Sequence, residues 1–153
     1  MIQIGDLAPD FELLTDEDQP LRLSDLRGRR VVLFFFPRAD TPGCTAQACG
    51  FRDRMPVIEA GNAIVLGLSP DLPEALAKWR AKEKLPYNLM SDPNHEMADA
   101  FGAWGEKSMF GKTYDGILRG HAIIGADGRI EDLRVRIGPD ESVQAAVEFL
   151  QSH

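Results

Sequence analysis

The sequence lacks a long apolar run, a signal peptide and an excess of positive charge. Its longest apolar segment, residues 31–36 (Val-Val-Leu-Phe-Phe-Phe), is far shorter than the roughly 20 residues of a membrane-spanning helix. The first six residues, Met-Ile-Gln-Ile-Gly-Asp, show no basic stretch followed by an apolar segment. We therefore expect a protein that does not enter a membrane and that resides in the cytoplasm.

Acidic side chains outnumber basic ones by 24 to 17, which gives a net charge of −7. Nucleic acids and anionic membrane surfaces attract clustered Lys and Arg, so this balance argues against both as partners. Arg27, Arg29 and Arg30 form a small basic cluster. We interpret this cluster as a solvated turn before the apolar segment, in preference to a phosphate site.

Cysteine is also scarce, because Cys44 and Cys49 are the only two. Two cysteines are too few for the disulfide framework of a small secreted protein. A chain of 153 residues, 44% of them hydrophobic, does not need such a framework to fold, and we expect one domain over residues 1–153. The Cys-x4-Cys spacing and the three scattered histidines give no zinc ligand set, so no metal is predicted.

The apolar pattern predicts alternating strands and helices. Strands are expected at residues 11–14, 21–23, 31–36 and 63–68, followed by a hairpin of 121–125 and 129–136 around an Ala-Asp-Gly turn. Helices are expected over about 43–60, from 73, from a cap at 92–93, and near the C-terminus, with a short helical turn at 24–27. This order predicts an α/β, thioredoxin-like fold, whose central, mostly parallel sheet has an antiparallel edge and is flanked by helices.

Apolar residues at helical spacing predict which helix faces are buried. In the first helix these residues are Cys44, Ala48, Phe51, Met55 and Ile58. In the second they are Leu72, Leu76 and Trp79, in the third Met97 and Phe101, and in the last Val143, Val147 and Leu150.

Cys44 stands where a thiol is readily ionised, because it follows a buried strand and a Thr-Pro-Gly turn at the start of a helix. A free thiol with a pKa near 8.5 is about 3% ionised at pH 7, and lowering that pKa to about 6 raises the fraction to about 90%. This gain of about thirtyfold, or about 2 kcal/mol, is small beside the acceleration that an efficient enzyme provides. Further donors must stabilise the charge that develops as the thiolate reacts. The Thr41 hydroxyl is one candidate, and Pro37 is a candidate to shield the sulfur from solvent.

Cys49 follows Cys44 by five positions. If both lie in one continuous helix, their Cα atoms are about 8.7 Å apart, beyond the roughly 7 Å limit for a disulfide, and their side chains point to different faces. A disulfide between them therefore requires this turn of helix to unwind. We predict a redox-dependent conformation for residues 43–52.

The alternative interpretation is purely structural: both cysteines are buried core residues, since cysteine is among the most buried residue types. The Thr-Pro-Gly turn after a buried strand favours redox chemistry instead.

Residues 41–45 (Thr-Pro-Gly-Cys-Thr) and 49–53 (Cys-Gly-Phe-Arg-Asp) resemble the peroxiredoxins of the bacterioferritin-comigratory, or Q-type, subfamily. Pro37, Thr41 and Cys44 fill the Pro-x3-Thr-x2-Cys signature of peroxiredoxins. Residues 104–119 and the N-terminal Gly-Asp-x-Ala-Pro-x-Phe also fit, so the resemblance covers nearly the whole chain.

The resemblance implies a thiol peroxidase without a metal, haem or flavin cofactor. Cys44 is then the peroxidatic cysteine, which hydrogen peroxide or an organic hydroperoxide oxidises to a sulfenic acid. Cys49 is the resolving cysteine that condenses with it to an intrachain disulfide, which thioredoxin or a similar dithiol protein reduces. Thr41 and Arg119 are the polar groups of the peroxide site. An intrachain disulfide requires no dimer, and we expect a monomer.

The match is looser after Arg119, where the subfamily usually has a Ser- or Thr-bearing strand and this chain has His121. We interpret His121 as a strand residue with a satisfied or exposed ring. Two other functions remain open: a general thiol–disulfide oxidoreductase, against which the absence of Cys-x2-Cys argues, and a non-catalytic redox sensor or partner-binding module that uses the same unwinding as a switch.

Overall fold

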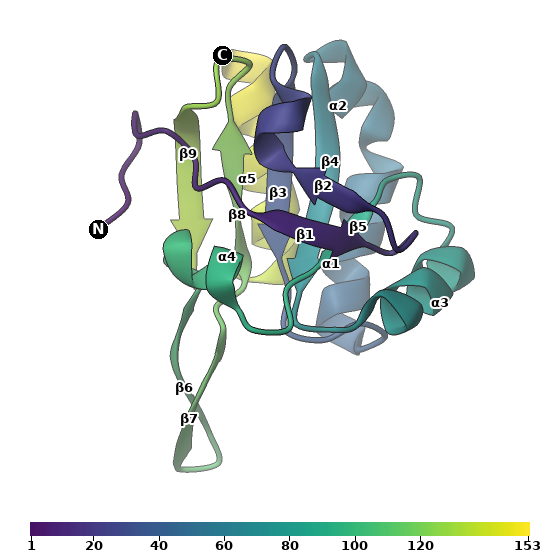
Figure 1. Cartoon of the computed structure of the whole chain (residues 1–153), viewed down its shortest axis with the longest axis vertical. Helices are drawn as coiled ribbons and strands as arrows, with labels where there is room; N and C mark the ends of the chain where they lie inside the picture. The colour runs from purple at the N-terminus through teal and green to yellow at the C-terminus, as the bar shows by residue number, and fades with distance from the viewer.

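A seven-stranded mixed sheet lies at the centre of the molecule (Figure 1). The structure, a computed structural model, describes residues 1–153. The strand order is β2-β1-β5-β4-β3-β8-β9. The strands are β1 (Glu12–Thr15), β2 (Pro20–Arg22), β3 (Arg30–Phe35), β4 (Ala63–Ser69), β5 (Leu89–Ser91), β8 (Gly120–Ile124) and β9 (Ile130–Val135).

The middle of the sheet is parallel and both sides are antiparallel. Strand β4 pairs in parallel with β3 and with β5. On one side β8 pairs antiparallel with β3 and β9 with β8, and on the other side β1 pairs antiparallel with β5 and β2 with β1. The predicted α/β architecture is therefore confirmed, with antiparallel strands at both edges where the sequence indicated one.

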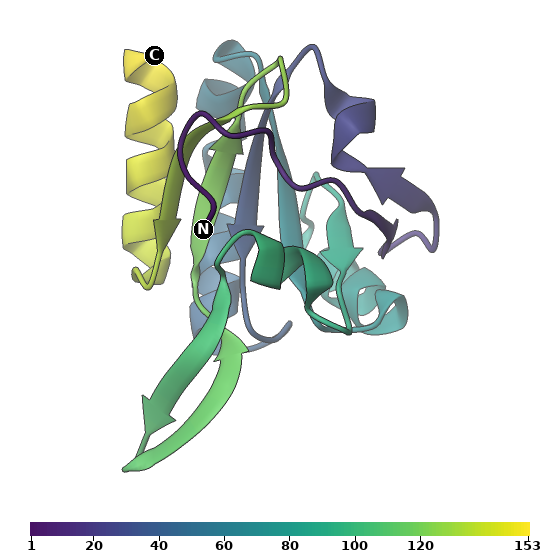
Figure 2. The same ribbon diagram turned by 60° about the vertical axis from the view of Figure 1, so that its left-hand side comes forward.

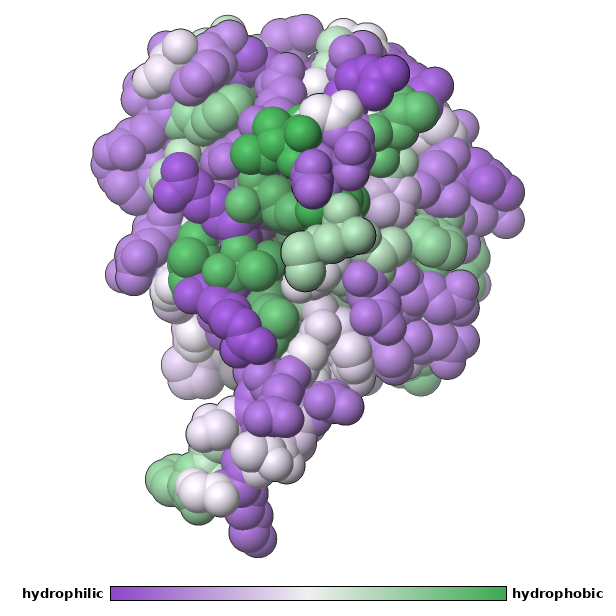
Figure 3. Space-filling model, turned by 90° about the vertical axis from the view of Figure 1, so that its left-hand side faces the viewer, coloured by the Kyte–Doolittle hydropathy of each residue, from purple (hydrophilic) through white to green (hydrophobic).

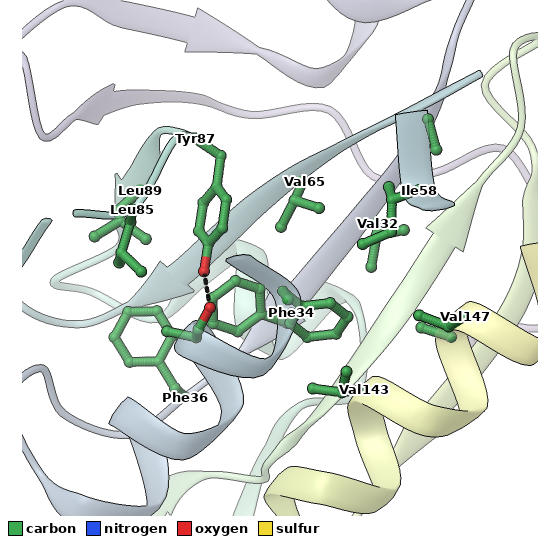
Figure 4. Packing of buried hydrophobic residues seen from close by; sticks show 14 of the residues in the cluster. Val32, Phe34, Phe36, Ile58, Val65, Leu85, Tyr87, Leu89, Val143 and Val147 are labelled. Carbon is green, nitrogen blue, oxygen red and sulfur yellow. Dashed lines mark hydrogen bonds between the residues drawn. The ribbon is translucent and has the colours of Figure 1, made fainter. Parts of the chain in front are cut away.

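Strand β3 is buried on both faces, which explains its uninterrupted apolar sequence. Val32, Phe34 and the following Phe36 belong to the core layer shared with α1, α2, α3 and α5 (Figure 4). Val31, Leu33 and Phe35 belong to the opposite layer, under α4 and η1. Figures 1 and 2 show α1, α2 and α5 on one face of the sheet and α4 on the other.

The helices begin near the predicted starts, with two exceptions. They are η1 (Leu23–Leu26, a 3-10 turn), α1 (Pro42–Asp53), α2 (Met55–Ala60), α3 (Pro73–Glu83), α4 (Glu96–Ala100) and α5 (Pro139–Ser152). The inward residues are buried as predicted for most positions, and Met55 is half-buried. The prediction that Leu72 is buried is wrong. Leu72 precedes α3 as its N-cap and is 61% exposed, so it does not belong to the buried face of α3.

The single helix expected over 43–60 is broken at Arg54. Pro56 explains the break, because a proline inside a helix lacks the amide donor and its ring clashes with the carbonyl four residues earlier. Pro56 is instead tolerated in the first turn of α2. Both cysteines stay within the unbroken part, α1.

The helix expected to open at Asp92 and Pro93 begins only at Glu96. Residues 92–95 form a turn closed by the bond from the His95 amide to the Asp92 carbonyl (2.9 Å), and His95 adopts a left-handed conformation with φ of 48°. The Asp92 carboxylate still accepts a bond from a helix amide, that of Ala98 (2.9 Å). Asp92 therefore satisfies a helix-end donor from outside the helix.

A two-stranded hairpin, β6 (Trp104–Met109) and β7 (Lys112–Ile117), projects from the body (Figures 1 and 2). In Figure 3 it forms an arm with hydrophobic atoms at its tip, where Met109 and Phe110 are 55% and 96% exposed. The segment had no predicted secondary structure.

None of the helices combines the length and apolar composition needed to span a membrane.

Candidate active site

Cys44 lies in the first turn of α1, just beyond the end of β3. The chain leaves the sheet after Phe36 and enters the helix at Pro42, so Cys44 is the third helical residue. The first-turn amides of a helix have no partner within it and carry partial positive charge, which favours an anion at this position. Cys44 is a free cysteine and is fully buried.

Arg119 brings a cation to this sulfur from a distant part of the sequence. It lies between β7 and β8, and its Nη2 donates to Cys44 Sγ at 3.5 Å. Gly43 makes this approach feasible, because a Cβ atom at that position would stand 3.0 Å from Arg119 Nη2. The predicted pairing of Cys44 with Arg119 is thus present in the geometry.

Gln47 fixes the guanidinium of Arg119 from behind. Arg119 Nη1 donates to Gln47 Oε1 at 2.9 Å, and Gln47 Nε2 donates to the Gly120 carbonyl at 3.2 Å and to Ser142 Oγ at 3.1 Å. Gln47 and Ser142 are fully buried. Sequence reasoning missed Gln47, although a polar residue one turn after Cys44, next to the buried Ala48, was a signal for it.

His121 extends this network into the core. Its Nδ1 is 2.8 Å from Ser142 Oγ, and its buried Nε2 has no hydrogen-bond partner. Burial lowers the pKa of His121 from 6.5 to about 4, with Asp132 opposing the shift and Arg134 adding to it. His121 is therefore neutral at pH 7. The expected strand position is confirmed, but the expectation of a satisfied or exposed ring is wrong, because the ring is fully buried and only Nδ1 has a partner. The ring is two hydrogen bonds removed from Gln47.

Thr41 and Pro37 bound the loop that leads to Cys44. Thr41 is the N-cap residue of α1, and its hydroxyl donates to the Arg38 carbonyl at 2.8 Å. That hydroxyl must turn away from Arg38 before it can donate to a peroxide. Pro37 directly follows the last buried residue after β3 and is half-buried.

Cys49 lies further along α1 and is half-buried, apart from the Arg119 network. Its Sγ donates to Glu83 Oε1, on α3, at 3.5 Å. Burial raises the pKa of the Cys49 thiol, Arg52 opposes this, and the hydrogen bond to Glu83 raises the pKa further. No sequence pattern points to Glu83.

Three contacts hold α1 in place around the two cysteines. Tyr87 Oη donates to the Ala48 carbonyl at 2.5 Å, as Figure 4 shows. Arg52 Nη1 donates to the Glu83 carbonyl at 2.6 Å, and Trp79 Nε1 donates to Thr45 Oγ1 at 3.2 Å. Each is a contact that unwinding of this helix would strain or break.

No three His, Cys, Asp or Glu side chains are arranged so that they could hold a metal ion.

Comparison with known proteins gives a consistent result along the whole chain. Residues 4–133 match the family model described as the AhpC/TSA family. Peroxiredoxin Bcp of Escherichia coli strain K12 is 48% identical over 152 residues, which cover 99% of this chain and 97% of that protein. Peroxiredoxin Bcp of Bacillus subtilis strain 168 is 43% identical over 150 residues, covering 98% and 96%.

Two solved structures show the same thioredoxin-like α/β fold. A cysteine-to-serine variant of PrxQ from Xylella fastidiosa superposes with a TM-score of 0.93 at 27% identity, covering 100% of this chain and 98% of that one. Peroxidoxin BcpB of Mycobacterium tuberculosis gives a TM-score of 0.87 at 32% identity, covering 99% and 98%.

Proposed function

Because this chain belongs to the AhpC/TSA family and is a peroxiredoxin, a thiol peroxidase, we propose that it reduces hydroperoxides at Cys44 and forms an intrachain disulfide with Cys49. The observation that carries the proposal is the hydrogen bond from the Arg119 guanidinium to Cys44 Sγ in the first turn of α1. A fixed cation and free helix amides favour a thiolate and stabilise the charge that develops during its attack.

In the first step the Cys44 thiolate attacks one oxygen of the hydroperoxide. The S–O bond forms as the O–O bond breaks, the other oxygen leaves as water or an alcohol after taking up a proton, and Cys44 becomes a sulfenic acid. Arg119, held by Gln47, is in place to stabilise the oxygen that accumulates charge. Thr41 joins as a donor once its hydroxyl leaves the Arg38 carbonyl.

The substrate reaches the sulfur only after a local movement, because Cys44 is fully buried. The residues next to it in the site, Thr41, Gly43 and Arg119, are half-buried, so the sulfur lies close beneath the surface.

In the second step Cys49 condenses with the sulfenic acid and water leaves. Both cysteines lie in the continuous helix α1, where residues five apart are separated by more than a disulfide can span. Resolution therefore requires a turn of α1 to unwind. Thioredoxin or a similar dithiol protein then reduces the disulfide by exchange, in a cytoplasm that keeps thiols reduced.

Peroxide consumption with thioredoxin, thioredoxin reductase and NADPH tests this assignment. We expect Cys44→Ser to abolish the reaction with peroxide, because it removes the nucleophile. Cys49→Ser should react once, form a sulfenic acid and then depend on an added small thiol. Full thioredoxin-coupled activity of Cys49→Ser would refute its resolving role, and negligible turnover of the wild type would instead indicate a redox sensor.

A further inference from the structure

The two cysteines of α1 lie in opposite electrostatic surroundings. Cys44 Sγ receives a hydrogen bond from the cationic Arg119, whereas Cys49 Sγ donates one to the anionic Glu83. A guanidinium stabilises a thiolate, and a carboxylate stabilises a thiol. The two sulfurs thus differ in the charge of the group that each contacts as well as in position.

We propose that Glu83 holds Cys49 as a neutral thiol docked on α3 until α1 unwinds, and thereby confines the first oxidation to Cys44. This inference rests on the proposed function, because it assigns Cys49 the resolving role. It adds a residue outside α1 and outside the Arg119 network to the reaction.

The position of Glu83 supports this role. It is the last residue of α3, it is half-buried, and its main-chain carbonyl accepts the hydrogen bond from Arg52 Nη1 (2.6 Å). Its carboxylate makes no salt bridge, and its hydrogen bond is with Cys49 Sγ. A hydrogen bond to a charged carboxylate is stronger than one to a neutral acceptor.

The other charged and titratable groups around Cys49 are Arg52 and Asp53 on α1 and Tyr87 after α3. Arg52 favours the thiolate, but its guanidinium also binds the Asp53 carboxylate at 2.9 Å. Arg52 donates to Asp53 and to the Glu83 carbonyl and makes no hydrogen bond to Cys49 Sγ. Glu83 is therefore the charged group that contacts the sulfur itself.

Unwinding of α1 carries Cys49 away from Glu83 and so removes the group that favours the protonated form. Cys49 then gives up its proton, and its sulfur attacks the sulfur of the Cys44 sulfenic acid. The S–S bond forms, the S–O bond breaks, and the hydroxyl leaves with that proton as water. One movement both brings the sulfurs together and activates the second one.

Alkylation of Cys49 by iodoacetamide tests the role of Glu83 directly. We compare Cys44→Ser with Cys44→Ser/Glu83→Gln between pH 6 and 10, after circular dichroism has shown that both are folded. Because only the thiolate reacts, replacing the charged acceptor by a neutral one should shift the alkylation profile to lower pH and raise the rate at pH 7 about fivefold.

Glu74→Gln in the same background is the matched control, because Glu74 loses the same charge from the same helix but pairs with Lys78. Its profile should overlay that of Cys44→Ser. The proposal is wrong if the Glu83→Gln profile also overlays it, or if the rate rises equally at all pH values, since that indicates loosened packing without a change in ionisation.

The alkylation assay involves no peroxide and no turnover, so its outcome is independent of the activity test above. A shifted profile with an unreactive Cys44 would contradict the proposed function and leave the Glu83 contact established. An unshifted profile with normal peroxidase activity would contradict the role of Glu83 alone.

Discussion

At the scale of single residues, the arrangement of donors and acceptors determines how Arg119 meets Cys44. A guanidinium only donates, so the Gln47 atom that faces it must be Oε1. Gln47 Nε2 then faces two acceptors, the Gly120 carbonyl and Ser142 Oγ. The donor or acceptor at each contact thus determines the orientation of the next side chain. This buried network holds the Arg119 guanidinium in one orientation.

His121 ends this network and makes folding stability depend on pH. Its pKa in the folded protein is about 4, below the ordinary 6.5, so between these pH values the unfolded chain binds a proton that the folded chain does not. The free energy of unfolding should therefore fall as the pH drops from about 6.5 to about 4. By linkage this single group accounts for a loss of about 3 kcal/mol.

His121→Asn should remove this part of the pH dependence, because asparagine does not titrate in that range. Urea unfolding at pH 4.5 and pH 7.5 measures the loss of stability in the wild type and the variant. We expect the loss to be about 2 to 3 kcal/mol smaller in the variant. Equal losses in both proteins would show that His121 titrates normally or is protonated in the folded state.

At the scale of secondary structure, the proposed mechanism requires α1 to hold Cys44 in place and also to open. Its stability comes from outside the helix as well as within it, through Tyr87, Arg52 and Trp79. Phe51 also stacks on Phe34 of β3, with ring centroids 5.0 Å apart. The rate of resolution should therefore depend on contacts that do not touch either sulfur.

Tyr87→Phe should accelerate disulfide formation about fivefold. The substitution keeps the ring, which packs edge-on against Phe34, but removes a hydrogen bond of about 1 kcal/mol that is present while α1 is folded. Rapid mixing with peroxide, followed by acid quench and counting of free thiols, gives the rate.

Tyr114→Phe is the control, because Tyr114 is 44% exposed on the β6–β7 hairpin and its hydroxyl makes no hydrogen bond within the protein. It should leave the rate unchanged. An unchanged or slower rate in Tyr87→Phe would mean that the Tyr87 contact is retained during resolution.

At the scale of the whole molecule, the pairing of β3 with β8 brings Arg119 close to Cys44. The C-terminal end of β3 lies between β4 and β8, and Arg119 immediately precedes β8. Because β3 and β8 are antiparallel, the C-terminal end of β3 lies beside the N-terminal end of β8, and Phe35 pairs with Gly120. This pairing places Arg119 beside the first turn of α1.

The oxidised protein should be less stable than the reduced one. A disulfide between residues five apart closes a short loop, so it removes less entropy from the unfolded chain than a long loop does, about 2 kcal/mol at 25 °C. Unwinding α1, in contrast, disturbs the packing of buried residues such as Ala48 and Phe51. We expect the thermal midpoint to fall by at least about 4 °C on oxidation, if about 2 kcal/mol is lost.

Calorimetry of the peroxide-treated and dithiothreitol-treated protein measures this difference, with Cys49→Ser treated in the same way as the control. The variant cannot form the disulfide and should show a smaller change. A higher midpoint for the oxidised wild type would mean that the disulfide forms without loss of helix packing.

The sequence determined most elements of the fold and which residues are predicted to carry the chemistry. An apolar run without alternation identified β3, and the motif around Cys44 identified the start of α1. Local rules failed where a nearby residue altered the helix, as Pro56 did after α1 and His95 did before α4.

Only the tertiary structure decided which groups surround each sulfur. Glu83 on α3 contacts Cys49, whereas Gln47 on α1, Ser142 on α5 and His121 on β8 form the hydrogen-bonded network behind Arg119. The physical reason is that hydrogen bonds and charges act over a few ångströms in space, and sheet pairing together with helix packing set those distances between residues far apart in the chain. Cys44 and Cys49 share one helix, yet tertiary contacts give one sulfur a cation and the other an anion.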